Sequence, residues 1–306
     1  MQEVITYTIA QVSTVLLGKE PQIRLALACL LSRGHLLIED LPGMGKTTLS
    51  HALARVMGLS YTRIQFTSDL LPADILGVSV FDKNTGSFAF HPGPIFNQLI
   101  LADEINRTTP KSQSALLEAM EEQQVTIEGE TRPLPKPFFV IATQNPNNQG
   151  GTFALPESQL DRFLMRIELG YPDPAAERQL LKGEDRRDVL SRLQPTITPA
   201  QLAEMQTQCQ HVKVSDALLD YIQRLVLFTR QAPEFAYGLS PRGALALLAA
   251  AKSWAFLEDR QHVVPEDVQA VLPSVVEHRL RETADFSGHG AGGLTQRLLS
   301  KVDIIG

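Results

Sequence analysis

The sequence predicts an α/β fold class, a parallel sheet with helices on its faces, followed by an all-α region. Short apolar runs alternate with helical patterns up to about residue 170, which is typical of a parallel sheet covered by helices. The first run is followed directly by a glycine-rich loop and then by apolar residues at helical spacing. From the segment YPDP at residues 171–174 onward only helical signals follow. We therefore expect two domains, residues 1–170 and residues 171–306.

Five apolar runs predict the strands of the sheet, and they lie at residues 35–39, 62–66, 99–102, 138–142 and 164–169. Between the third and the fourth run, residues 112–122 show helical spacing. Two further segments alternate with period two around a turn, which predicts hairpins inserted into the α/β domain. These hairpins lie at residues 78–90, around DKNTG, and at residues 125–133, around GETRP.

The helical region carries its own start signals. Thr198 before Pro199, with Gln201 three residues further on, forms a capping box, and Ser215 and Ser240 each precede an apolar helical pattern. The string GHGAGG at residues 288–293 matches G-x-G-x-x-G, but no predicted strand precedes it. We interpret this string as a linker and not as a dinucleotide site.

The overall composition predicts a soluble globular protein. Of 306 residues, 43% are apolar and 20% are charged, and the length suits one large or two ordinary domains. A formal net charge of −6 provides no electrostatic footprint for nucleic acid. Cys29 and Cys209 lie in apolar runs without paired spacing, which predicts buried thiols in a reducing compartment. Because the sequence shows neither a basic leader nor a run long enough for a membrane helix, we expect a cytoplasmic protein without membrane insertion.

The loop DLPGMGKTT, residues 40–48, has the chemistry of a phosphate-binding loop, although Asp40 stands where the usual pattern has glycine. In such loops backbone N–H groups at a helix N-terminus converge on phosphate, a lysine pairs with the β- and γ-oxygens, and a hydroxyl faces Mg²⁺. Asp40 lies at the entrance of the loop, so we expect it to change how the chain enters the loop more than how phosphate is held. The predicted nucleotide-binding residues are Pro42, Gly43, Met44, Gly45, Lys46, Thr47 and Thr48.

Polar residues end two later strands. The run LILADE places Asp103 and Glu104 at a strand end, where one carboxylate can hold Mg²⁺ through water and the next can polarise an attacking water. The run FFVIATQNP ends in Asn145, whose uncharged amide can hold that water or report the γ-phosphate. Alone, these residues would indicate solvated charges and an Asn-Pro turn. The preceding glycine loop favours a site in which Thr47 and Asp103 face the metal and Glu104 and Asn145 are catalytic.

Two arginines are further candidates. Arg162, in LDRF, lies just before the last predicted strand, and Arg242 lies in the first turn of a helix, where the helix dipole favours an anion. Either could instead pair with an acid on its own surface, so local sequence alone leaves their roles open.

Together these motifs resemble the AAA+ ATPases and, within them, the MoxR family. DLPGMGKTT resembles the Walker A loop of that family, in which an acidic residue commonly replaces the first glycine. LILADEINRTTPKSQSALLEAMEEQQVTIEG resembles its Walker B strand with the hairpin after it, and FFVIATQNP resembles its sensor 1. LPESQLDRFLMRIELGYP resembles the end of its core domain. The resemblance covers most of residues 10–280.

The resemblance implies a P-loop AAA+ core with a parallel five-stranded sheet of order 5-1-4-3-2, a helical lid, and assembly into a homo-oligomeric ring, commonly a hexamer. It makes Arg162 the arginine finger that acts in the neighbouring subunit's site and Arg242 the sensor 2 arginine, with Arg107 as second choice for a contact in trans. The hairpins at residues 78–90 and 125–133 correspond to the family's helix-2 and pre-sensor inserts. Chaperone-like action with von Willebrand factor A domain proteins is also implied.

We therefore expect Mg²⁺-dependent ATP hydrolysis by a ring that remodels or matures partner proteins. A metal-insertion subunit resembling magnesium chelatase would carry the same motifs and stays an alternative. A DNA-acting motor is disfavoured because both hairpin turns carry little net charge. A GTPase is disfavoured because no N-K-x-D motif follows the loop, and a non-hydrolysing scaffold is disfavoured because Lys46 and Glu104 are both present.

Overall fold

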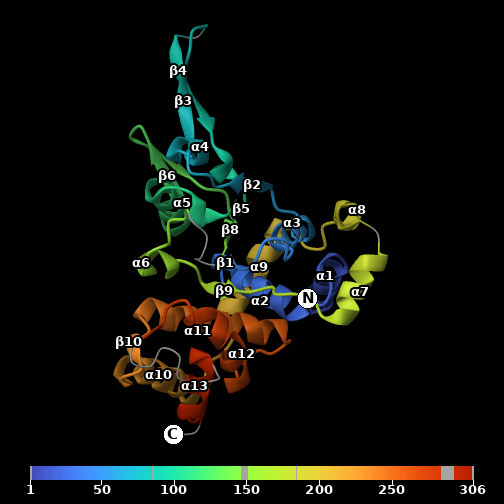
Figure 1. Cartoon of the computed structure of the whole chain (residues 1–306), viewed down its shortest axis with the longest axis vertical. Helices are drawn as coiled ribbons and strands as arrows, with labels where there is room; N and C mark the ends of the chain where they lie inside the picture. Colours follow the sequence, from blue (N-terminus) through green and yellow to red (C-terminus); the bar gives the residue numbers. More distant parts are fainter. Residues whose placement is uncertain (1, 85, 146–150, 184, 284–292, 305–306) are drawn as a thin grey trace.

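The computed structural model describes residues 2–304 except residues 85, 146–150, 184 and 284–292 (Figure 1). Its α/β part contains the elements α1 Gln2–Val15, α2 Glu20–Leu31, β1 Leu36–Glu39, α3 Lys46–Val56, β2 Tyr61–Gln65, α4 Pro72–Leu76, β3 Gly77–Asp82, β4 Ser87–Pro92, β5 Leu99–Asp103, α5 Pro110–Glu122, β6 Gln124–Ile127, β7 Glu130–Pro133, β8 Phe139–Gln144, α6 Glu157–Leu160 and β9 Met165–Ile167. Two short 3₁₀ helices, η1 Pro94–Phe96 and η2 Ile105–Arg107, flank β5. The later elements are α7 Pro174–Lys182, α8 Arg186–Arg192, α9 Pro199–Gln210, α10 Asp216–Gln231, β10 Phe235–Tyr237, α11 Pro241–Leu257, α12 Pro265–Val276, β11 Arg281–Glu282 and α13 Leu294–Lys301.

Five parallel strands form the central sheet in the order β2-β5-β8-β1-β9. Numbered among themselves along the chain, these strands have the order 5-1-4-3-2, so the expected topology is confirmed. In the strand register, Leu36 at the start of β1 pairs with Ile141 of β8 and with Met165 of β9. Because the strands are parallel, their carboxyl ends meet at one edge of the sheet, which is where ligands bind in open α/β sheets.

Helices cover both faces of this sheet. Leu36 and Ile38 of β1 belong to a core shared with α1, α2 and α3, whereas Leu37 points into a second core with α4 and α5. The first core continues into α9, α10, α11 and α12. A strand buried on both faces needs apolar residues at every position, which explains why the strands are visible in the sequence as short apolar runs.

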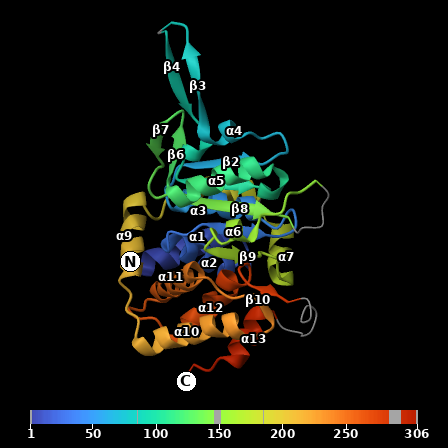
Figure 2. The same ribbon diagram turned by 90° about the vertical axis from the view of Figure 1, so that its left-hand side faces the viewer.

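Both expected hairpins are present, as the pairs β3–β4 and β6–β7. The β3–β4 pair projects from the body at the end of the molecule opposite α10 and α13 (Figures 1 and 2). Its Phe81 and Phe88 are exposed and contact each other edge to face, with ring centroids 5.3 Å apart. At its base, the guanidinium carbon of Arg132 in β7 lies 4.0 Å from the ring centroid of Phe90, so the two hairpins contact each other.

The expected helix starts are confirmed in the later part of the chain. Thr198, Ser215 and Ser240 each accept a backbone N–H of the following first turn. The expectation of helices alone was wrong, because β10 and β11 form a small antiparallel sheet. These strands have three and two residues, and α11 and α12 lie between them in the sequence. They are too short to produce a periodic pattern.

Further expectations meet the structure with different results. Cys29 and Cys209 are buried free thiols, and burial raises the pKa of both, that of Cys209 to about 12. No helix among the described residues is long and apolar enough to cross a membrane. Of the GHGAGG string, residues 288–292 lie outside the described residues.

Since α8 packs on α1 and α3, the chain just after residue 170 stays in contact with the α/β part, and the domain boundary there remains a prediction.

His35 ties together three elements at the amino edge of the sheet. Its Nδ1 accepts the Val140 N–H at 3.0 Å, so its Nε2 carries the proton and donates to the Met120 carbonyl at 3.3 Å. Burial lowers the pKa of His35 from 6.5 to about 4. The neutral imidazole therefore links β1 to β8 and α5.

The folded protein should lose stability as the pH falls from about 6.5 to about 4, because the unfolded chain binds a proton at His35 that the folded chain excludes. His35 contributes roughly 3 kcal/mol to the difference in unfolding free energy between pH 7 and pH 4. Urea unfolding at several pH values measures this slope. His35→Asn should flatten it, while His211→Asn, the same exchange at an exposed site, should not. An equal slope in wild type and His35→Asn would contradict this assignment.

Candidate active site

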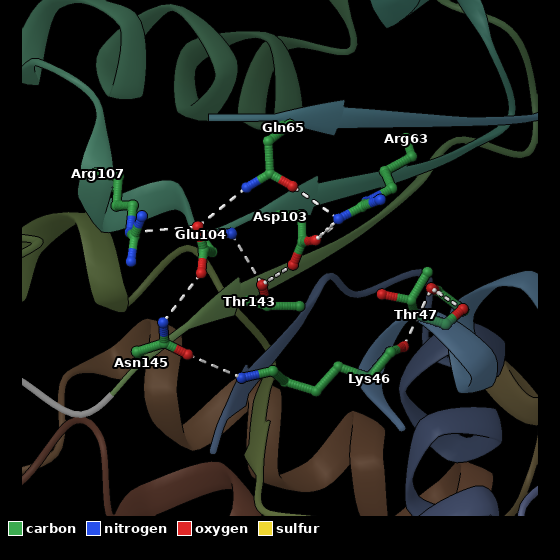
Figure 3. Close-up of polar contacts among 10 residues, drawn as sticks. Lys46, Thr47, Arg63, Gln65, Asp103, Glu104, Arg107, Thr143 and Asn145 are labelled. Carbon is green, nitrogen blue, oxygen red and sulfur yellow. Dashed lines mark hydrogen bonds and ion pairs between the residues drawn. The ribbon is translucent and has the colours of Figure 1, made fainter. Parts of the chain in front are cut away.

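The loops after β1, β5 and β8 meet at the carboxyl edge of the sheet (Figure 3). The loop after β1 leads into α3, which begins at Lys46. Strand β5 ends in Asp103 and is followed by Glu104, and β8 is followed by Asn145. Because β8 lies between β1 and β5, a side chain after β8 can contact residues that follow both neighbours.

The loop from Leu41 to Gly45 has the curvature of a phosphate cradle. Gly43 and Gly45 have positive φ values of 85° and 93°, a conformation that residues with a Cβ rarely adopt. A Cβ on Gly45 would also lie 2.8 Å from Leu16 Cδ1. Leu41, Pro42 and Gly43 are exposed and lie just before the N-terminus of α3, where backbone N–H groups and the helix dipole favour an anion.

Asp40 has a specific partner that explains its place in the loop. Its Oδ2 accepts the backbone N–H groups of Leu169 at 2.8 Å and Gly170 at 2.6 Å. Its Oδ1 accepts the Leu41 N–H at 2.8 Å. The carboxylate therefore holds the start of the loop against the chain that leaves β9, a contact that glycine cannot make.

Lys46 lies at the centre of the site and is 8% exposed. Its Nζ donates to the Asp40 carbonyl at 2.5 Å and to Asn145 Oδ1 at 3.2 Å. Burial lowers the pKa of Lys46, and the nearby carboxylates of Asp40, Asp103 and Glu104 counteract this effect. Thr47, the next residue, is exposed in the first turn of α3.

Glu104 is held in an unusual backbone conformation and contacted from several sides. Its φ and ψ of 57° and 49° are left-handed, and its N–H donates to Thr143 Oγ1 at 2.9 Å. Its Oε1 accepts Asn145 Nδ2 at 3.1 Å and its Oε2 accepts Gln65 Nε2 at 3.0 Å. Arg107 Nε lies 3.2 Å from Oε2. Asn145 thus connects Lys46 to Glu104.

Both oxygens of Asp103 are engaged within the protein. Arg63 of β2 donates to Oδ2 from Nε at 3.0 Å and from Nη2 at 2.5 Å, and Thr143 Oγ1 donates to Oδ1 at 2.5 Å. Arg63 also donates to Gln65 Oε1 at 2.7 Å, so the β2 side chains form one network with both acids. Sequence reasoning missed Arg63, Gln65 and Thr143. Thr143 could have been found from its place at a strand end, whereas Arg63 and Gln65 carry no local signal.

Arg162 and Arg242 do not join this cluster. Both pair with Glu121 at the end of α5, Arg162 Nε at 3.0 Å from Oε2 and Arg242 through its Nη2. Gly34 and His35, which precede β1, line the same pocket, so this group lies at the amino edge of the sheet. Gly34 and Asp40 flank β1, and the two edges are therefore roughly 15–20 Å apart at about 3.3 Å per residue.

Comparisons with known proteins agree on the kind of fold. Residues 35–165 match the family model described as "ATPase family associated with various cellular activities (AAA)", and residues 227–298 match the AAA lid domain. The uncharacterized protein YeaC of Bacillus subtilis is 44% identical over 97% of this chain and 93% of its own length. Chaperone MoxR1 of Mycobacterium tuberculosis is 40% identical over 90% of this chain and 75% of its own length. A crystal structure of a candidate ATPase from Cytophaga hutchinsonii has a TM-score of 0.89 at 36% identity, covering 99% of this chain and 95% of that one.

Replacing Asp40 by alanine should lower the free energy of unfolding by about 1.5–3 kcal/mol, because the backbone N–H groups of Leu41, Leu169 and Gly170 lose a charged acceptor. Urea unfolding at pH 7 measures the loss. Asp40→Asn keeps an acceptor oxygen and should lose clearly less. An alanine variant as stable as wild type would show that the carboxylate does not hold Leu169 and Gly170.

Proposed function

Because the chain belongs to the MoxR family of AAA+ ATPases, we propose that it binds ATP and Mg²⁺ at the carboxyl edge of the sheet and hydrolyses ATP within a ring of identical subunits. One observation carries the proposal: the Asn145 amide joins the Lys46 ammonium to the Glu104 carboxylate, by contacts of 3.2 Å and 3.1 Å. These contacts support a site in which Lys46 would bind the phosphates and Glu104 would act as the base for water.

The loop residues fit the binding of a triphosphate. The backbone between Pro42 and Thr48, in which Pro42, Gly43 and Thr47 are exposed, leads into the start of α3, and the positive φ values of Gly43 and Gly45 allow close approach. Lys46 would pair with the β- and γ-phosphate oxygens. Its present partner, the Asp40 carbonyl, is a neutral acceptor that a charged phosphate oxygen can replace.

Thr47 and Asp103 would hold Mg²⁺, which proteins usually bind through one or two side chains together with phosphate oxygens. The ion would neutralise charge on the phosphates. Since Thr143 and Arg63 occupy both oxygens of Asp103, a contact to the ion through water fits this carboxylate best.

Glu104 would take the proton of the attacking water. Asn145 and Gln65 each hold one of its oxygens, so the direction of the carboxylate is set from two sides. Asn145 contacts both Lys46 and Glu104. A phosphate bound by Lys46 would therefore affect the position of Glu104 through Asn145.

Arg162 and Arg242 would act on the nucleotide of the neighbouring subunit. Their shared partner Glu121 lies at the amino edge of the sheet, away from Lys46 of the same chain. Arginines that stabilise transferring phosphate must reach it directly. Assembly into a ring, proposed as a hexamer, would bring this edge to the next subunit's site, whereas Arg107 lies against Glu104 of its own chain.

The proposed output is remodelling or maturation of partner proteins, with von Willebrand factor A domain proteins as the proposed partners. The name of the chaperone relative supports action on proteins. Around the two hairpin turns, the described charged residues are three acids and two bases, Asp82, Lys83, Glu128, Glu130 and Arg132, with no excess of basic groups. This charge supports a protein client over nucleic acid.

Lys46→Ala should abolish tight ATP binding, because the loop loses its fixed positive charge. Glu104→Gln should bind ATP but not turn it over, since an amide cannot accept the proton. Nucleotide titration and phosphate release measure the two steps. Unchanged ATP affinity of Lys46→Ala, or wild-type turnover of Glu104→Gln, would contradict the proposed site.

Mixing inactive variants tests the role of Arg162 between subunits. Arg162→Ala should lower kcat by about 10³–10⁵ with little effect on ATP binding. Mixed rings of Arg162→Ala and Lys46→Ala subunits contain interfaces where an intact loop faces an intact arginine, so activity should exceed that of either parent. The trans role fails if Arg162→Ala hydrolyses ATP normally, or if mixed rings form without recovered activity.

A further inference from the structure

We propose that Arg279, in the turn after α12, is a positioning residue that sets the direction of Arg162 and thereby links the helical region to the site of the neighbouring subunit. This inference rests on the proposed function of Arg162 in trans. Arg279 does not touch the nucleotide site of its own chain. It would act through the backbone that carries Arg162.

The guanidinium of Arg279 binds the chain on both sides of Arg162. Its Nη2 donates to the carbonyls of Asp161 at 3.2 Å and Phe163 at 2.6 Å. Its Nη1 donates to the Leu164 carbonyl at 3.1 Å, and its Nε donates to Asp161 Oδ1 at 2.7 Å. The side chain is only 3% exposed. The guanidinium is planar and has five N–H donors, so it can hold the backbone on both sides of Arg162 in one fixed arrangement.

In the segment from Asp161 to Leu164, the backbone N–H groups bond to other parts of the chain, whereas Arg279 binds three of the four carbonyls. This segment connects α6 to β9 and lies outside both elements. The Arg162 N–H donates to the Gln159 carbonyl at 3.2 Å, and the Arg162 side chain pairs with Glu121 on α5, an ion pair that a nucleotide phosphate could replace. When that pair is broken, the contacts of Arg279 with the backbone on both sides of Arg162 remain.

Arg279 also contacts the turn that carries Arg242. A Cβ on Gly243, in the first turn of α11, would lie 3.2 Å from Arg279 Cδ, so the stem of Arg279 packs closely against that turn. Asp161, Arg162, Arg242 and Arg279 line one pocket. Arg279 lies within the residues that match the AAA lid domain. The position of this helical region against the α/β part would therefore determine the positions of Arg162 and Arg242 together.

Arg281 provides a matched control two residues further on. It pairs with Glu157 at 3.0 Å, but both side chains are well exposed, and such pairs contribute little. Arg279→Met and Arg281→Met remove the same group from the same segment. Only Arg279→Met should change the orientation of Arg162 toward the neighbouring subunit.

The test uses the full-length ring and compares four measurements. Arg279→Met should keep the ATP affinity of wild type and lower kcat by about 10²-fold, since a misplacement of about 1 Å can cost that much. Mixed with Lys46→Ala, it should regain activity, because its own loop is intact; mixed with Arg162→Ala, it should not. Hydrogen exchange of the amides from Asp161 to Leu164 should become faster. Arg281→Met should match wild type in each measurement.

A merely structural role for Arg279 would give a different pattern. Arg279→Met would then lose ATP affinity in its own subunit or fail to restore activity when mixed with Lys46→Ala. Either result overturns the inference. If Arg162→Ala still restores activity when mixed with Lys46→Ala, the proposed function is unaffected. If Arg162→Ala itself does not complement, the proposed function fails and the inference with it. Should Arg279→Met not fold, Arg279→Lys keeps the charge without the fork and must show the same pattern.

Discussion

The amide of Asn145 is the contact on which the rest of the candidate site depends. It accepts from Lys46 and donates to Glu104, two residues that follow different strands. This double contact is possible because β8 lies between β1 and β5 in a parallel sheet, so that all three carboxyl ends meet at one edge. A different strand order would separate the cation from the carboxylate whatever their places in the sequence.

A second layer of side chains holds the acids in place. Arg63 and Gln65 on β2 contact Asp103 and Glu104, and Thr143 binds the Asp103 side chain and the Glu104 backbone. The left-handed backbone of Glu104 is a costly conformation for a residue with a side chain, and it persists only where neighbouring groups enforce it. The proposed base is therefore oriented by the fold before any ligand arrives.

The length of the sheet separates two groups of charged residues. Lys46 and the acids lie at the carboxyl edge, while Arg162 and Arg242 share Glu121 at the amino edge. A single subunit cannot bring the two groups together, since the strands between them are rigid and extended. In the proposed ring, one edge would face the opposite edge of the next copy, and Arg279 is proposed to connect the helical region to the arginines.

The sequence alone was enough for the fold class and for the positions of Lys46, Asp103, Glu104 and Asn145, because each lies near an apolar run that predicts a buried strand. The sheet order was an expectation from the resemblance to the MoxR family, and the structure confirms it. It also predicted both hairpins and three helix starts from local patterns. Only the tertiary structure decided what Asp40 binds, that Arg63 and Gln65 reach the acids, and that Arg162 and Arg242 share one acid far from Lys46. The physical reason is range: strand and helix signals arise between neighbours in the chain, whereas these contacts join residues on different elements and depend on side-chain direction once the sheet has formed.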